Sequence, residues 1–225
     1  MSRRRTRPPT ELSMSVGAEQ RQRWRRYWDR NARGYDRQMG LLDRVLFRDT
    51  RRWVCSQATG RVLEVAIGTG LNLEHYPGEV TLTGVDLSPV MLELAQRRAG
   101  ELHRTVDLRV GDAEALQFPE ASFDGVVCTF SLCGIPDHRR AVAEMVRVLR
   151  PGGTLLLADH VAAAHPAVRA VQRVAELASV PLAGEHFRRR PMELVRAAGL
   201  RVERHDRFAG GIVERLAARV SAEAT

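Results

Sequence analysis

Three acidic side chains occupy positions where the ligand-binding edge of a parallel sheet is expected. Glu64 lies in the apolar segment RVLEVA (61–66), Asp86 ends a second apolar segment, and Asp112 follows a third. The carboxyl ends of parallel strands meet at one edge of an open α/β sheet, and ligands bind there. Carboxylates accept hydrogen bonds from hydroxyl, amino and ammonium groups. A single acid at a strand end usually caps a helix, but three in succession favour a shared site.

A glycine-containing turn, GTG (68–70), follows the first of these segments. Gly68 and Gly70 allow a tight turn and let the backbone approach a ligand without an intervening Cβ. The dinucleotide fingerprint G-x-G-x-x-G would need a third glycine where Leu73 stands. Glu64 beside a pyrophosphate would be unfavourable, whereas it suits a cationic group. S-adenosylmethionine has an ammonium group and no phosphate, so these residues favour it over a dinucleotide.

Apolar segments alternate with helical periodicities along the body of the chain. Strands are expected at 61–66, 81–86, 105–110, 124–130, 153–159, 201–207 and 211–217. Helices are expected at 88–100, with Ser88 as the N-cap, and at 137–149, 166–179 and 191–198. This alternation predicts a mostly parallel sheet with helices on both faces.

The N-terminal part differs from this body in charge and pattern. Residues 1–60 contain 15 arginines and 6 acids, whereas residues 61–225 contain 20 arginines and 21 acids, so the net charge of +8 arises near the N-terminus. Residues 1–17 are expected to form a disordered basic tail. Residues 18–58 are expected to form a helical lid of two helices broken near Gly34 and Gly40. The catalytic or binding domain is then 59–220.

Composition narrows the class of protein further. No apolar run approaches the ~20 residues of a membrane-spanning helix, and no apolar stretch follows the N-terminal arginines as in a secretory signal. Cysteines number three, which is few and odd. These features predict a cytoplasmic protein with reduced thiols. No Cys/His spacing predicts a metal site.

As an ordered set, the motifs over residues 24–160 resemble those of class I S-adenosylmethionine-dependent methyltransferases with the ubiquinone-methyltransferase-type domain (methyltransferase type 11). VLEVAIGTGLNL resembles the first motif, LTGVDLSPVML the second, and GDAEALQFPEASFDGVVCTFSLCGI the third and fourth. LRPGGTLLLAD resembles the turn before the fifth strand, and WDRNARGYD the lid element. The resemblance implies a Rossmann-like seven-stranded α/β fold with an N-terminal helical lid. It implies methyl transfer from S-adenosylmethionine to a small molecule or lipid.

The resemblance also implies which residues contact each part of the cofactor. They are Glu64, Gly68, Gly70, Cys128 and Thr129 for the methionine part, Asp86 for the ribose, Leu87, Met91, Asp112 and Ala113 for the adenine, and Tyr35 closing over the whole. Ala66 is a departure, because the family usually has glycine there. Its methyl group narrows the space beside the cofactor.

The acceptor of the methyl group is less well defined. EVAIGTGLNLEHYP and LRPGGTLLLADHV resemble small-molecule thiol methyltransferases and bacterial phospholipid N-methyltransferases. The segment YDRQMGLLDRVLFRDTRR lacks the YD-x-x-N element and the His-Arg segment of the quinone enzymes, which disfavours a quinone. Thiol, amine and hydroxyl acceptors all remain open.

Methyl transfer requires alignment and the exclusion of water, and needs a base only if the acceptor must lose a proton. His160, at the tip of the fifth strand, is the candidate base; a histidine bonded to backbone in a turn is the alternative. Glu185, His186 and the arginines at 188–190 precede a late helix in a region that often lines the acceptor pocket. The arginines would suit an anionic acceptor, and a solvated helix face is the alternative.

The arginine-rich N-terminus has three interpretations: a solvated tail, a weak anchor to a membrane surface with anionic lipids, or a nucleic-acid arm. The body has no net basic charge, which disfavours the third, so no nucleic-acid partner is predicted. Two alternatives to methyl transfer remain, a non-catalytic S-adenosylmethionine-binding protein and a nucleotide-dependent oxidoreductase. The oligomeric state is left open.

Overall fold

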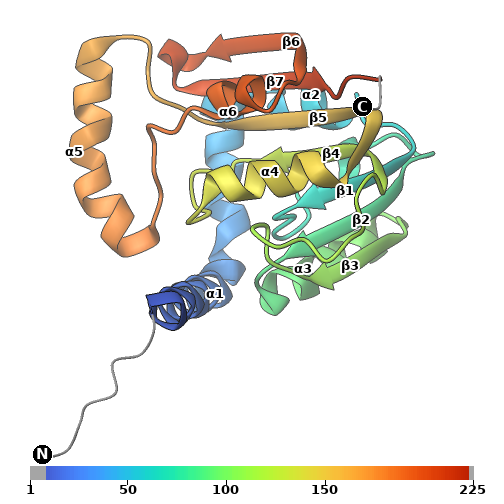
Figure 1. Cartoon of the computed structure of the whole chain (residues 1–225), viewed down its shortest axis with the longest axis horizontal. Helices are drawn as coiled ribbons and strands as arrows, with labels where there is room; N and C mark the ends of the chain where they lie inside the picture. Colours follow the sequence, from blue (N-terminus) through green and yellow to red (C-terminus); the bar gives the residue numbers. More distant parts are fainter. Residues whose placement is uncertain (1–8, 223–225) are drawn as a thin grey trace, which may run out of the picture.

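A computed structural model describes residues 9–222 of the chain, with side chains at 21–181 and 184–222. A seven-stranded sheet forms its middle layer (Figure 1). The strands are β1 (Arg61–Val65), β2 (Thr81–Asp86), β3 (Val106–Val110), β4 (Phe123–Thr129), β5 (Leu149–His160), β6 (Arg201–Phe208) and β7 (Val213–Arg219). The helices are α1 (Pro9–Leu42), α2 (Thr50–Cys55), α3 (Pro89–Glu101), α4 (His138–Val148), α5 (Pro166–Ala183) and α6 (Pro191–Ala197), with short helical segments η1 (Asp43–Phe47), η2 (Leu73–His75) and η3 (Ala209–Gly211).

The order of the strands creates a crevice beside β1. The sheet runs β3-β2-β1-β4-β5-β7-β6, with β1 to β5 parallel and β7 antiparallel to both of its neighbours. The chain winds outward from β1 to β3 on one side and from β4 onward on the other. At such a reversal the connections diverge and leave a crevice at the carboxyl ends of the strands. The predicted Rossmann-like α/β fold is therefore confirmed.

Two apolar clusters hold helices against the two faces of the sheet. Leu63 and Val65 of β1 belong to a cluster with residues of α4 and α6. Val62 belongs to the other cluster, which contains residues of η1, α2 and α3. This period-two alternation is the pleat of a strand buried on both faces. Glu64 lies between Leu63 and Val65, so it shares the second face with Val62.

Capping residues fix where two helices begin beside the crevice. Ser88 Oγ accepts a hydrogen bond from Met91 N at 3.1 Å, and Pro89 occupies the first turn of α3. Asp137 Oδ1 accepts from Arg140 N at 3.0 Å at the start of α4. A side-chain oxygen of this kind satisfies a backbone N–H that the helix leaves free. The predicted N-cap at Ser88 is therefore present.

Helix α1 is longer and less interrupted than predicted. It runs through Gly34 and Gly40 without a break, and the chain departs from α-helical geometry only at the π-helical η1 and at Arg48, where φ is 53°. Of the predicted disordered tail, residues 9–17 are helical, and residues 1–8 lie outside the described residues. Each glycine costs a helix about 1 kcal/mol relative to alanine, a cost that tertiary contacts offset.

Two acidic residues of α1 make the tertiary contacts that hold this helix in place. Asp29 accepts a hydrogen bond from Ser88 Oγ at 2.5 Å. Asp36 accepts from Thr69 Oγ1 and pairs with Arg98, both at 2.5 Å. Helix α1 is therefore fixed across the carboxyl edge of the sheet, on both sides of Gly34. Across the described residues, none of the helices has the length and apolar character needed to cross a bilayer.

Candidate functional site

A pocket at the carboxyl ends of β1 to β4 contains eight of the thirteen predicted site residues. They are Tyr35, Ala66, Gly68, Asp86, Leu87, Met91, Asp112 and Ala113. The other five predicted residues do not line it; they are Glu64, Gly70, Cys128, Thr129 and His160. The pocket lies in the crevice that the strand order creates, where ligands of open α/β sheets bind.

The turn after β1 brings backbone to the pocket without covering it. Gly68 has φ of +58°, and a Cβ on it would meet nothing within 4 Å. A Cβ on Gly70 would lie 2.8 Å from Leu73 Cδ1 and 3.3 Å from the Cα of Ala95. Gly68 thus leaves its side of the pocket open, whereas Gly70 is needed for the close packing of the turn on α3.

Ala66 adopts a left-handed conformation, with φ of 57°, that favours glycine. A Cβ in this region costs about 1–2 kcal/mol, and the freedom that glycine adds to the unfolded chain offsets about 0.4–1 kcal/mol. Ala66→Gly is therefore expected to raise the free energy of unfolding by about 0.5–1 kcal/mol, measured by urea denaturation without ligand. Ala113→Gly is the control, because Ala113 lines the same pocket without a positive φ. Ala113→Gly should lower the free energy of unfolding. If Ala66→Gly lowered it as well, the backbone at Ala66 would not be strained.

Asp86 is held at the end of β2 by two backbone donors. Its Oδ2 accepts from Gly68 N and its Oδ1 from Ser88 N, each at 2.9 Å. Burial raises the pKa of Asp86 to about 6, although these hydrogen bonds act in the opposite direction. Both oxygens keep a lone pair for the pocket, so the carboxylate can accept two further hydrogen bonds.

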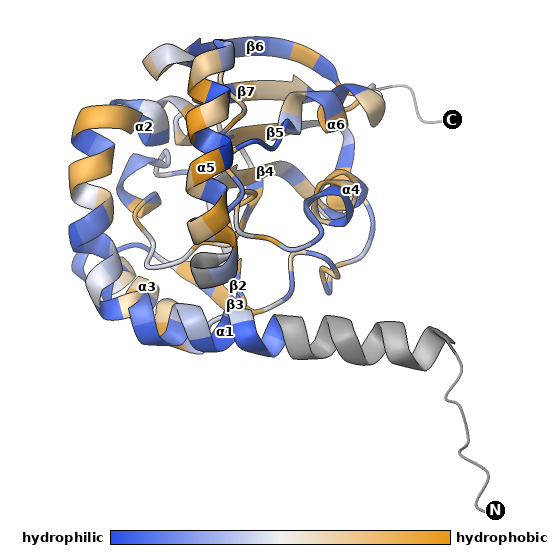
Figure 2. Cartoon of the chain, turned by 90° about the vertical axis from the view of Figure 1, so that its left-hand side faces the viewer, coloured by the Kyte–Doolittle hydropathy of each residue, from blue (hydrophilic) through white to orange (hydrophobic). Residues whose placement is uncertain are grey.

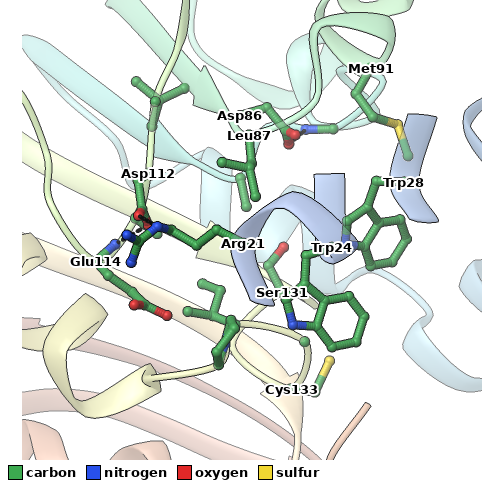
Figure 3. Close-up of a pocket in the computed structure, with 18 of the residues that line it drawn as sticks. Arg21, Trp24, Trp28, Asp86, Leu87, Met91, Asp112, Glu114, Ser131 and Cys133 are labelled. Carbon is green, nitrogen blue, oxygen red and sulfur yellow. Dashed lines mark hydrogen bonds and ion pairs between the residues drawn. The ribbon is translucent and has the colours of Figure 1, made fainter. Parts of the chain in front are cut away.

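Asp112 lies opposite an arginine of α1 (Figure 3). Its Oδ1 accepts from Glu114 N at 2.9 Å, and its Oδ2 lies 3.4 Å from Arg21 Nε. Glu114 in turn accepts from Asp137 N at 2.8 Å. The loop after β3 is thus fixed by its own acids, with one carboxylate oxygen directed to the pocket side.

Aromatic side chains of α1 form the outer wall of the pocket. Trp24, Trp28 and Tyr35 line it, and the rings of Trp28 and Tyr35 meet edge to face with centroids 6.0 Å apart. Figure 3 shows Trp24 and Trp28 opposite Leu87 and Met91. The remaining cavity is about 110 Å³, smaller than the ~300–1,000 Å³ typical of ligand pockets. Helix α1 therefore acts as the cover of the crevice.

Glu64 belongs to a buried polar network behind the pocket wall. Its two oxygens accept from Asn72 Nδ2 at 2.7 Å and Tyr76 Oη at 2.9 Å. Thr129 Oγ1 accepts from the same Asn72 nitrogen at 2.8 Å and from Arg51 Nη1 at 3.4 Å. Burial raises the pKa of Glu64 to about 7. Direct contact of Glu64 or Thr129 with a ligand stays a prediction.

Arg51 is the buried cation of this network, and it is not among the site residues predicted from the sequence. It lies on α2, and its Nη1 donates to Asn72 Oδ1 at 3.0 Å. Its Nε lies 3.0 Å from Asp43 Oδ1. The network therefore joins η1 and α2 to the glycine turn and the end of β4. One arginine among the 35 of this chain carries no signal in a single sequence.

His160 lies behind the pocket, within a set of aromatic rings. Its ring centroid is 5.0 Å from that of Phe47 and 5.7 Å from that of Phe130, which lines the pocket. Within the described part of the chain, Nδ1 of His160 is buried and has no hydrogen-bond partner. The predicted base is thus next to the pocket wall and not on it.

Asp159 connects His160 to the loop after β4. Its oxygens accept from the backbone N–H groups of Cys133, at 3.1 Å, and of His160, at 2.7 Å. Potential ligand atoms of these three side chains lie within 4.8 Å of one another. Both oxygens of Asp159 already accept backbone hydrogen bonds, and the predicted absence of a metal stays a prediction.

Of the acceptor candidates between α5 and α6, only Glu185 reaches the pocket. Its carboxyl group is half-buried, and burial raises its pKa, while nearby His160 acts to lower it. Arg188 pairs with Glu176 at 2.5 Å. Arg189 turns its guanidinium to the backbone carbonyls of Leu132 and Ile135. Arg190 is exposed and pairs with Glu193. None of the three arginines lines the pocket, so the cluster does not face a ligand there.

Comparison with known proteins gives consistent matches. A family model described as a methyltransferase domain matches residues 63–157. A phosphatidylethanolamine N-methyltransferase of Cereibacter sphaeroides is 38% identical over 141 residues, which cover 62% of this chain and 69% of that protein. A demethylmenaquinone methyltransferase of Deinococcus radiodurans is 40% identical over 130 residues, which cover 53% of this chain and 54% of that protein. The chain thus spans about half the length of the second relative.

A solved structure shares the fold. An S-adenosylmethionine-dependent methyltransferase from Thermotoga maritima superposes with a TM-score of 0.64 and 21% identity, covering 86% of this chain and 98% of that one. At this identity the likeness concerns the architecture alone.

Proposed function

The chain belongs to the S-adenosylmethionine-dependent methyltransferases, and from this we propose that its acceptor is the amino group of a small molecule or lipid head group. The observation that carries the proposal is the carboxyl group of Glu185, which lines the pocket together with the aromatic side chains of Trp24, Trp28 and Phe130. The finer assignments of residues to parts of the cofactor and acceptor are likewise proposed.

The residues around the turn and β2 fit the nucleoside part of S-adenosylmethionine. Backbone donors orient both oxygens of Asp86, and in our proposal these oxygens accept hydrogen bonds from the two ribose hydroxyls. Gly68 has open space where a Cβ would stand. Leu87 and Met91 provide apolar surface for adenine, and Asp112 an acceptor for its amino group. When bound, the cofactor supplies a methyl group on a sulfonium, which passes to the acceptor while the C–S bonding electrons return to sulfur.

The opposite end of the pocket suits a cationic or amino group. Glu185 lines the pocket there, next to Gly184, which packs against the indole of Trp24; Phe130 also lines the pocket. Aromatic rings and a carboxylate both attract an ammonium group. The backbone carbonyl of Glu185 accepts a hydrogen bond from Ser179 Oγ at 2.9 Å. Its carboxylate accepts none from the described residues. The carboxylate is therefore free to accept from an acceptor's N–H.

An ammonium group must lose one proton before its lone pair can attack a methyl carbon. Glu185 is placed to take that proton, and its raised pKa makes it a stronger base than an exposed glutamate. His160 lies within electrostatic reach of Glu185. We therefore assign proton acceptance to Glu185 and not to His160, the base that the sequence favours; His160 acts to lower the pKa of Glu185 against the effect of burial.

Removal of the Glu185 charge tests the amine assignment. Glu185→Gln is expected to lower kcat/KM for an amine acceptor by about 100-fold or more, as loss of a general base does. Glu193→Gln is the control, since Glu193 is exposed and pairs with Arg190 on the surface, outside the pocket lining. The measurement is transfer of labelled methyl groups to a panel of phosphatidylethanolamine vesicles, small amines, thiols, phenols and a quinol.

The same panel separates the competing acceptors. Label in the phosphatidylethanolamine or amine samples, lost in Glu185→Gln and kept in Glu193→Gln, supports the proposal. Label confined to thiols or to the quinol, or an unchanged rate in Glu185→Gln, would show that the acceptor is not an amine. Binding of S-adenosylhomocysteine should be the same in both variants, because neither side chain lies at the nucleoside end.

A further inference from the structure

Helix α5 exposes a row of apolar side chains. Val171, Val174 and Leu177 are 68%, 67% and 76% exposed, and they follow one another at intervals of three residues. Figure 2 shows α5 in front of the body, with much of its outward side in the hydrophobic colours. Contiguous exposed apolar surface of this kind marks an interaction site more often than isolated apolar residues do.

The apolar character extends over one half of the helix. Successive residues rotate by about 100°, which places the exposed apolar residues on the half that faces away from the sheet. They are Ala167, Val168, Ala170, Val171, Val174, Ala175, Leu177, Ala178 and Pro181. We call this set the outer face of α5. At ~1.5 Å per residue, the 18 residues of α5 give it a length of roughly 27 Å.

The opposite half of α5 is polar and is the half that the fold uses. Gln172 is buried and donates to the carbonyls of Val161 and Phe187 at 2.9 and 3.1 Å. Glu176 is buried and accepts from Arg188 Nε at 2.5 Å. The usual arrangement, an apolar side inward and a polar side outward, is therefore inverted. Folding of this chain leaves the outer face of α5 without a partner among the described residues.

Arginines border the outer face of α5 on one side. Arg169 and Arg173 of α5 line a surface hollow together with Arg188 and Arg190. Glu176 is the one acid on α5, and it is turned inward to Arg188. An anionic partner therefore meets cations beside the apolar surface and no opposing exposed acid on the helix.

We propose that the outer face of α5 docks on the surface of a lipid bilayer that contains anionic lipids. A helix with an apolar side and bordering arginines lies in the plane of the interface, with apolar side chains among the acyl chains and guanidinium groups at the phosphates. A second copy of this chain fits less well. Pairing of two outer faces would bring arginines together, with no exposed acid on either α5 to neutralise them.

Docking through α5 would place the pocket close to the lipid surface. Helix α5 ends at Ala183, and Glu185, which lines the pocket, follows two residues later. The intervening Gly184 packs against the indole of Trp24, which also lines the pocket. The proposed docking surface is thus followed directly in the sequence by residues of the acceptor end of the site. The docking proposal does not depend on which atom receives the methyl group.

Vesicle binding by the full-length chain tests the proposal. The wild-type chain should co-sediment with vesicles of phosphatidylcholine and phosphatidylglycerol, less with phosphatidylcholine alone, and less at high salt, because salt screens exposed charges. Leu177→Asp should lower the partition coefficient by roughly tenfold or more. Leu102→Asp is the matched control, because Leu102 is 41% exposed at the end of α3, and it should bind as the wild type does.

A second pair of variants tests the arginines. Arg173→Gln should reduce binding to the anionic vesicles and its dependence on salt, whereas Arg97→Gln, an exposed change on α3, should not. Thermal unfolding should be alike in all variants, since each changed side chain is exposed.

Three results would overturn the proposal. The first is that the wild-type chain does not bind anionic vesicles. The second is that Leu177→Asp binds them as tightly as the wild type, which would assign binding to another region such as the N-terminal arginines. The third is that Leu177→Asp converts a dimer into a monomer in solution, which would assign the outer face of α5 to a second copy. None of these results bears on whether the protein transfers methyl groups.

Discussion

Asp86→Ala is expected to lower the affinity for S-adenosylhomocysteine by about 100-fold or more. Hydrogen bonds to a charged group contribute roughly 1.5–3 kcal/mol each, and we propose that this carboxylate accepts two of them from the ribose hydroxyls. The substitution also removes the acceptor of the Gly68 and Ser88 N–H groups, which the carboxylate holds at 2.9 Å. The pocket would lose both the ligand contact and the orientation of the turn. Isothermal calorimetry measures the effect directly.

The affinity should also depend on pH in a definite direction. Burial raises the pKa of Asp86 from 3.8 to about 6 in the ligand-free protein. Two donating hydroxyls favour the ionised form, so binding tightens as the pH rises to about 6 and becomes constant above it. The folding stability of the ligand-free protein depends on pH in the opposite direction. The contribution of Asp86 to the free energy of unfolding is fully present below pH 3.8 and is lost as the pH rises through about 6.

Two further variants test whether Asp86 contacts the ligand directly or only maintains the structure of the pocket. Asp86→Asn should bind weakly and without the rise in affinity toward pH 6, because an amide does not titrate. Asp107→Ala should bind normally, since Asp107 pairs with Arg109 on the exposed part of β3. If Asp86→Ala bound S-adenosylhomocysteine within about threefold of the wild type, less than 1 kcal/mol, the ribose assignment would be wrong.

Arg51→Ala is expected to lower the free energy of unfolding by about 3–5 kcal/mol. Arg51 is buried and its ion-pair partner Asp43 is partly exposed, and each buried acceptor that is left without its donor costs about 1–3 kcal/mol. Here Asp43 would lose its cation, and oxygens of Asn72 and Thr129 would lose a donor. The positive charge of Arg51 also lowers the pKa of Glu64. Without it Glu64 ionises less readily inside the protein, so the destabilisation should be larger at alkaline pH.

The neighbouring residue provides a matched control. Arg52 follows on the same helix but is exposed, so Arg52→Ala should change the free energy of unfolding by no more than about 0.5 kcal/mol. Urea denaturation followed by circular dichroism measures both. A loss below about 1 kcal/mol in Arg51→Ala would mean that the network is not needed to hold α2 on the sheet.

Elements with a strong local pattern were predictable from the sequence. The strand at 81–86 agrees with β2 at both ends, and the other six agree within a few residues. Asp86 and Gly68 were identified because their positions depend only on the strand that precedes them. The largest error in a strand is the start of β5, at Leu149 and not at 153. The register between β4 and β5 shifts after the pair Phe123–Leu149. This extension of β5 depends on its pairing with β4 and cannot be read from the sequence of β5 alone.

The direction of Glu64 was encoded in the sequence. Because side chains alternate along a strand, a residue between Leu63 and Val65 points to the face opposite both of them. That face is covered by α2, so Glu64 enters the network of Arg51. Which helix covers which face is a tertiary property, and the identity of the partner therefore could not be derived from the strand alone.

The cover of the pocket shows the limit of local patterns. Gly34 and Gly40 are typical of a break in a helix, yet α1 continues through both because Asp29 and Asp36 find partners on other elements. The contribution of Glu185 to the pocket likewise depends on how the segment after α5 folds back. Such contacts join residues far apart in the sequence and leave no periodic signal.

Helix α1 gives the protein an internal optical reporter. The chain has three tryptophans, and two of them, Trp24 and Trp28, line the pocket from α1. The third, Trp53, is not part of the pocket lining; its ring centroid lies 5.0 Å from Cζ of Arg204 and 4.8 Å from Cζ of Arg215. A ligand that enters the crevice would change the surroundings of these two indoles. We expect their emission to report ligand binding in the unlabelled protein, on the time scale of a stopped-flow trace.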